Sequence, residues 1–208
     1  AEPFQFPARW MIWLISLLFF MSSYAYKDMQ TFGIQILTRS GSRRLWWLSK
    51  TLWCFFGTLL FHTVLWVTVC IACLVTKADL SLVLHADIIC KLFQTFSTGT
   101  AIGEIQISLL ALLLPVVISF SLCLCQMTLS LFIKPTLSFL TMAVIAILSV
   151  YLFSPALLCN YAMPIRTELF MSNGVNVDTG YIYAVSFDFF LILLGAIIFR
   201  SYDLINRD

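Results

Sequence analysis

Five long apolar segments constrain most strongly what this chain can fold into. They are separated by more polar stretches and lie at about residues 10–26, 51–76, 105–133, 136–154 and 181–199. A helix needs about 20 mostly apolar residues to cross the hydrocarbon core of a bilayer. Only 11% of the residues are charged, against roughly 25% in soluble domains. The sequence therefore predicts an all-α integral membrane protein, a bundle of five transmembrane helices, with residues 1–208 as a single transmembrane domain.

The polar segment 27–50 determines the predicted orientation. It carries five basic residues and only one acid, Asp28. Basic loops stay on the cytoplasmic side of a membrane, so we expect this segment inside. The inner segments then carry eight basic and three acidic residues, and the outer ones four basic and seven acidic. We expect a multi-pass protein of a bacterial cell membrane, with its N-terminus outside; an upstream helix would make six crossings.

A short amphipathic helix is expected within this inner segment. Its apolar residues recur with the spacing of one helix face, and they are Met29, Phe32, Gly33, Ile36 and Leu37. Ser42 is placed to cap the next helix. Arg39, Arg43 and Arg44 precede the pair Trp46–Trp47, which together form a basic and aromatic belt at a membrane surface. The amphipathic helix is either a connector at the lipid interface or a coupling helix that a cytoplasmic partner holds.

The layout of the chain resembles the permease subunits of ABC-type exporters with the type V fold. The resemblance covers nearly the whole chain: the spans, an amphipathic inner helix, and a structured outer loop before the last span. Residues 28–39 would match the coupling helix of that family. The sequence RSGSRRLWWLSK (39–50) is similar to the basic, Trp-rich start of the family's next helix. The first span of the family is not in this sequence, so the five spans would be its second to sixth.

This resemblance implies partners and a division of labour. The chain would be the permease subunit of an ATP-driven exporter, and no enzyme itself, because it has no GxxxxGK[ST] sequence to bind phosphates. A cytoplasmic ABC ATPase subunit would supply the energy, a second permease chain would complete a homo- or heterodimer, and membrane lipid would surround both. The residues implied in coupling and partner binding are Met29, Phe32, Ile36, Leu37, Arg39, Arg43 and Arg44.

Two other classes of function remain open. A non-transporting membrane scaffold or immunity protein would bind a partner through the same residues 28–50. A membrane-embedded enzyme is the weaker alternative, because the sequence has no Ser-His-Asp order, no HExxH and no paired carboxylates. The net charge of +2 is too small to suggest nucleic acid. His85, Asp87 and Cys90 lack a recognised ligand spacing, so the sequence predicts no metal site and no cofactor.

Three ionisable residues are candidates for a substrate path. His62 lies in the middle of the second span, where it is either functional or a neutral imidazole hydrogen-bonded to a neighbouring helix. Glu104 lies at the outer start of the third span, and Asp188 near the outer end of the fifth. Both carboxylates either line a route for a cationic substrate or lie among lipid headgroups.

The outer segments 77–104 and 156–180 are expected to be structured. We expect one or two short helices in the first and a short helix at 165–171 in the second. Cys90 and Cys159 fall in these segments, where a disulfide between them is an open alternative. Most of the seven cysteines lie inside predicted spans, where Cys behaves as a small apolar residue.

Overall fold

All regular secondary structure in the described part of the chain is helical. The computed structural model describes residues 8–22, 24, 27–28, 42–77, 104–163, 166–168 and 174–200. Its helices are α1 (Ala8–Ser22), α4 (Arg43–Thr76), α6 (Glu104–Leu129), α7 (Pro135–Tyr151), α8 (Leu158–Tyr161) and α9 (Val177–Arg200). The prediction of an all-α chain is confirmed for these residues.

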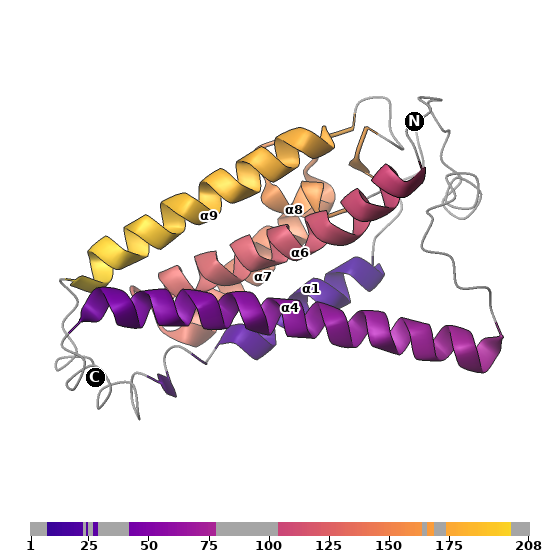
Figure 1. Cartoon of the computed structure of the whole chain (residues 1–208). Helices are drawn as coiled ribbons and strands as arrows, with labels where there is room; N and C mark the ends of the chain where they lie inside the picture. The colour runs from indigo at the N-terminus through magenta and orange to yellow at the C-terminus, as the bar shows by residue number, and fades with distance from the viewer. Residues whose placement is uncertain are drawn as a thin grey trace.

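Helix α6 is the centre of the bundle. It contacts each of the other five helices and runs between α9 on one side and α1 and α7 on the other (Figure 1). Of the 18-residue window Leu112–Leu129, 61% is buried, against 11% for the corresponding window of α4 and 28% for that of α9. The core is therefore built around α6, from side chains such as Ile118, Leu122 and Leu124.

Among the described residues, three helices are long and apolar enough to cross a membrane: α4, α9 and the Leu112–Leu129 part of α6. As described, α1 has 15 residues and α7 has 17, which correspond to about 22 and 26 Å of helix, less than the ~30 Å of a hydrocarbon core. Length and composition thus support three of the five predicted crossings, and a five-span bundle remains a prediction.

Helix α4 starts earlier than the apolar body of the predicted second span. Ser42 caps it in an extended conformation, and its Oγ accepts a hydrogen bond from the Leu45 backbone N–H at 3.4 Å. Thr76 is its last residue, and Lys77 follows in the left-handed conformation, with its N–H directed to the carbonyls of Cys73 and Leu74. The capping role predicted for Ser42 is confirmed.

Only the first half of α4 packs into the bundle. Its buried residues recur at helical spacing along one face: Trp46, Trp47, Lys50, Thr51, Cys54, Thr58 and His62. After His62 no residue of α4 is buried among the described parts of the chain, and this half extends past the other helices (Figure 1). The 34 residues of α4 span about 51 Å, so the helix would need a strong tilt to keep all its apolar surface within one bilayer.

Apolar side chains also cover the outside of the described helices. Phe56 and Leu60 on α4, and Ile182 and Phe189 on α9, are all more than 60% exposed. A soluble monomer rarely exposes contiguous apolar surface of this extent. These surfaces fit contact with membrane lipid.

The ends of several helices meet at one end of the bundle. Helix α4 begins beside the end of α9, and α1 and α6 finish on the same side (Figure 1). A hydrogen bond of 3.1 Å from Arg43 Nη1 to the carbonyl oxygen of Arg200 joins the two helix ends. We call this region the basic end and define it by Lys27, Arg43, Arg44, Lys50 and Arg200.

At the opposite end, Arg166 and Asn160 close the last turn of α7. Arg166 donates to the carbonyls of Ser149 and Val150 and to Asn160 Oδ1. The Asn160 side chain donates to the carbonyls of Leu152 and Ser154 at 3.1 and 2.8 Å. A cation at a helix C-terminus satisfies free carbonyls and complements the helix dipole. Burial lowers the pKa of Arg166 from its ordinary value, but the guanidinium remains charged.

The prediction of a short helix at 165–171 is wrong at Thr167, which is not helical. Thr167 forms an isolated parallel bridge with Val175, and the Glu168 N–H donates to the Val175 carbonyl at 3.0 Å. The backbone segments at Thr167 and Val175 therefore run side by side in the same direction. Gly174 permits their close approach, because a Cβ at that position would overlap the backbone of Thr167. Residues 78–103, which hold most of the other predicted outer segment, lie outside the described residues.

Candidate functional site

A buried ion pair lies at the basic end. Lys50 Nζ is 2.6 Å from Asp28 Oδ2, and the two side chains are only 9% and 18% exposed. The ammonium of Lys50 also donates a hydrogen bond to the hydroxyl of Tyr24, at 3.4 Å. It lies 5.0 Å from the ring centre of Tyr24 and 5.3 Å from that of Trp46. Asp28 and the two ring faces therefore all stabilise the charge of Lys50.

Aromatic stacking extends this ion pair to the neighbouring elements. Tyr24 stacks on Trp53 of α4, with ring centres 3.3 Å apart and an interplanar angle of 4°. Trp46 stacks on Phe199 of α9 at 4.5 Å and 13°. The chain that follows α1, the first turns of α4 and the last turn of α9 are thereby joined through Lys50 and its ring contacts.

Trp47 fixes α4 against α9. Its Nε1 donates a hydrogen bond to the Ile192 carbonyl at 3.0 Å. Its ring lies where the Cβ of residue 195 would be, so that only Gly195 admits it. The Trp47 side chain is 1% exposed. Because a buried Trp with a satisfied N–H has few alternative positions, this contact defines how the two helices cross.

The structure describes only part of the predicted coupling surface. Met29, Phe32, Ile36, Leu37 and Arg39 lie outside the described residues. Arg44 is exposed on the first turn of α4. Arg43 is half-buried and donates a hydrogen bond to the Arg200 carbonyl of α9; its role in partner binding stays a prediction.

His62 is fully buried, but its hydrogen bond differs from the predicted one. The partner of Nδ1 is the Thr58 carbonyl, 2.9 Å away in the same helix, where a bond to a neighbouring helix was expected. The imidazole lies edge-on to Trp13 of α1, with ring centres 4.9 Å apart. His62 Nε2 and Trp13 Nε1 are both buried and have no hydrogen-bond partner among the residues that the structure describes. A neutral imidazole that donates from Nδ1 keeps a lone pair on Nε2, which complements the indole N–H.

Asp188 lies half-way along α9 and not near its outer end, as the sequence had suggested. Helix α9 begins at Val177, four residues before the predicted span, which moves Asp188 to the middle of the helix. The side chain is 8% exposed and neighbours Ser121 of α6, and within the described part of the chain its Oδ1 has no hydrogen-bond partner. A carboxyl group at this depth is costly and marks a functional position by default.

Two of the three residues of the predicted substrate path, His62 and Asp188, lie on helices that the structure describes with their side chains. His62 faces α1, whereas Asp188 faces α6. Asp188 interacts electrostatically with Cys54, which is two turns before His62 on α4, or about 12 Å along the axis. Glu104 is described only as the first residue of α6. His62 and Asp188 are thus two separate buried polar positions on the described helices, and a path through them and Glu104 stays a prediction.

Sequence reasoning missed the partner of Lys50. Lys50 was recognised as part of the basic belt, and Asp28 as the one acid of the segment, but they are 22 positions apart in the sequence. A single acid among five basic residues, next to an apolar helix, was the available signal.

The chain matches no protein-family model, no curated protein and no solved structure. Its function therefore has to be argued from its own residues.

Proposed function

We propose that this chain is the membrane-spanning permease subunit of an ATP-driven exporter, which couples a separate cytoplasmic ATPase to substrate translocation. In this proposal five spans cross the cell membrane, and the basic end faces the cytoplasm. Residues 28–39 form the coupling helix and contact the ATPase. A second permease chain completes the transporter.

The observation that carries the proposal is the buried Lys50–Asp28 ion pair. Asp28 is the first residue of the predicted coupling segment, and Lys50 lies on the buried face of α4. A coupling helix transmits a movement only if it is held firmly by the transmembrane helices. A charge pair of 2.6 Å that is shielded from solvent provides such a link, because breaking it would leave an uncompensated charge.

The ring contacts and the Arg43 bond extend the link to α9. Force applied to residues 28–39 would thus reach two of the three helices that are long enough to span a membrane. An ordinary connector at the lipid interface needs no such attachment. The buried polar residues His62 and Asp188 then remain candidates for contact with substrate or with a partner helix.

The test is to uncouple transport without preventing insertion. Phe32, Ile36 and Leu37 are changed together to Asp, and ATP-dependent movement of peptides, lipids and small hydrophobic compounds is measured in inverted vesicles. A control variant changes Gln30, Gln35 and Thr38 to Asp on the opposite face of the predicted helix. The proposal expects transport to be lost in the first variant and kept in the second, with equal amounts of both in the membrane. Normal transport by the first variant would refute it.

One observation favours a second candidate, a non-transporting membrane scaffold or immunity protein that binds a partner through residues 28–50. Arg44 is exposed on the first turn of α4, so a partner that binds residues 28–50 has an accessible basic side chain to contact. This contact requires no ATPase. Membranes that contain the chain but show no nucleotide-dependent transport or partner would favour this candidate.

A further inference from the structure

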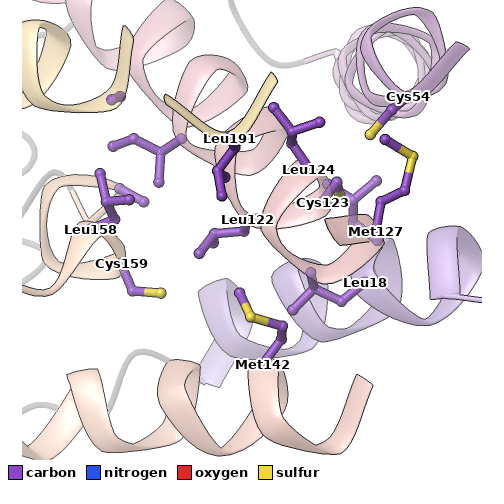
Figure 2. Close-up of a cluster of buried hydrophobic side chains, with 14 of the residues drawn as sticks. Leu18, Cys54, Leu122, Cys123, Leu124, Met127, Met142, Leu158, Cys159 and Leu191 are labelled. Carbon is purple, nitrogen blue, oxygen red and sulfur yellow. The ribbon is translucent and has the colours of Figure 1, made fainter. Parts of the chain in front are cut away.

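Four sulfur-containing residues line one cavity between α1, α4 and α6. They are Met21, Cys54, Cys123 and Met127. The cavity has a volume of about 10 Å³, enough for one water-sized particle. Figure 2 shows the Cys54 thiol directed at the end of the Met127 side chain, with Cys123 close by.

Helical spacing brings these sulfurs together. Cys123 and Met127 are four residues apart and therefore share one face of α6. Cys54 lies opposite them on α4 and lines the same cavity as Cys123 and Met127. Cys54, Cys123 and Met127 are all at least nine-tenths buried.

Gly57 leaves room for the side chain that carries the fourth sulfur, Met21. It lies one turn after Cys54 on the same face of α4. The Met21 side chain occupies the space that a Cβ at residue 57 would take, and its Sδ is 3.3 Å from that position. Any larger residue at position 57 would displace the Met21 thioether from α4.

The donor set selects a particular class of ion. Thiolates and thioethers are soft ligands that favour Cu(I), whereas zinc takes Cys, His and carboxylates. Within the described ranges, no three His, Cys, Asp or Glu side chains converge to hold a metal; here two of the four donors are methionines. We propose that Met21, Cys54, Cys123 and Met127 form a binding site for a soft monovalent metal ion, Cu(I) or Ag(I).

The ion can bind without adding a net charge to the core. One thiol loses its proton as its sulfur bonds the ion, and that proton passes to solvent. The thiolate and the monovalent cation together are neutral, so the apolar surroundings impose no uncompensated charge. The other thiol and the two thioethers add neutral sulfur donors.

The cavity also has a polar side, which provides a route for the ion and the proton. Ser22, Tyr24 and Ser130 line it. Ser22 is the last residue of α1, and Ser130 follows the end of α6, so this side faces the basic end. The site concerns this chain alone and does not depend on the proposed exporter function.

The test uses the purified full-length chain, reduced and metal-free, without any partner. Cu(I) is titrated against a chromogenic Cu(I) chelator, Ag(I) serves as a probe that does not change oxidation state, and X-ray absorption reports the donor atoms. We expect one ion per chain with a sulfur-only first shell. Cys54→Ser and Cys123→Ser should each abolish binding. Met127→Leu, which conserves volume and fold, should weaken it at least about tenfold, since even outer-shell partners of a metal contribute about 10–100-fold.

A second variant tests whether any pair of cysteines would suffice. Cys70 and Cys73 form a CxxC pair on the part of α4 that lies beyond the packed bundle. Changing both to Ser should leave the one-to-one binding unchanged. The proposal is overturned if the wild-type chain binds no ion saturably, if this control abolishes binding, if Met127→Leu binds as tightly as wild type, or if nitrogen and oxygen replace sulfur in the first shell.

Discussion

The Lys50–Asp28 ion pair allows a quantitative test of how the basic end is held together. Three variants form a double-mutant cycle: Lys50→Met, Asp28→Asn and the two combined. Met retains the length of the apolar stem of Lys, and Asn retains the shape of Asp, so the cycle isolates the charges. Lys77→Met is the matched control, because Lys77 is exposed at the far end of the same helix.

The expected magnitudes follow from what each variant leaves behind. Removing one partner of a buried pair costs about 3–5 kcal/mol. Lys50→Met leaves Asp28, which is 18% exposed, so we expect a loss near the lower limit, about 3 kcal/mol. Asp28→Asn leaves Lys50 with the rings of Tyr24 and Trp46, each worth about 0.5–2 kcal/mol, so about 1–2 kcal/mol is lost. The double variant should lose about 1 kcal/mol or less, because no charge stays buried.

These values predict a coupling energy of about 3 kcal/mol or more between the two positions. The assay is thermal unfolding in mild detergent, followed by tryptophan fluorescence. For a chain of this size 1 kcal/mol corresponds to about 2–4 °C, so Lys50→Met should lower the midpoint by about 6–12 °C. A coupling energy below about 0.5 kcal/mol, or a loss for Lys50→Met no larger than that for Lys77→Met, would show that the pair does not hold the connector to α4.

Three further predictions concern other parts of the fold. Gly195→Ala should lower the free energy of unfolding by about 1–3 kcal/mol, because the added methyl group displaces the anchored Trp47 ring. An unchanged unfolding midpoint would contradict the described α4–α9 contact. Asn160→Ala should lower the free energy of unfolding by about 2–3 kcal/mol, since it leaves the carbonyls after α7 unpaired. A loss no larger than that caused by changing an exposed Asn to Ala would argue against this cap. Burial raises the pKa of Cys159 from an ordinary value of 9.0 to about 11. The unfolded thiol therefore ionises first, and stability should fall as the pH rises from about 9 to 11; a Cys159→Ala variant, lacking this ionisation, should fall less over that range.

The helices could be predicted because apolar segments leave the backbone few alternatives in a membrane. The described bounds of α6 and α9 lie within a few residues of the predicted spans. The start of α4 was also visible, because Ser42 has the chemistry of an N-cap. The shorter helices α1 and α7 are harder to predict, since hydropathy does not distinguish a complete span from an apolar helix that only packs against one.

The contacts between helices could not be predicted from one sequence. Periodicity identifies the faces of a helix but not the neighbour of each face. His62 was expected to bond a neighbouring helix and instead bonds the Thr58 carbonyl. Asp188 was placed too close to a helix end. The sulfur-lined cavity draws on three separate helices, and no local pattern relates Met21 to Cys54 or Cys123.

The central claim, that residues 28–39 couple this chain to an ATPase, is tested most directly by identifying what remains bound to it. The full-length tagged chain is purified in mild detergent from its native membrane, and its partners are identified by mass spectrometry. The account predicts an ATPase with a Walker sequence, recovered in stoichiometric amount, lost when Phe32, Ile36 and Leu37 become Asp, and retained when Gln30, Gln35 and Thr38 do. Recovery of the chain alone, or only with copies of itself, under conditions that keep other transporters assembled, would contradict it.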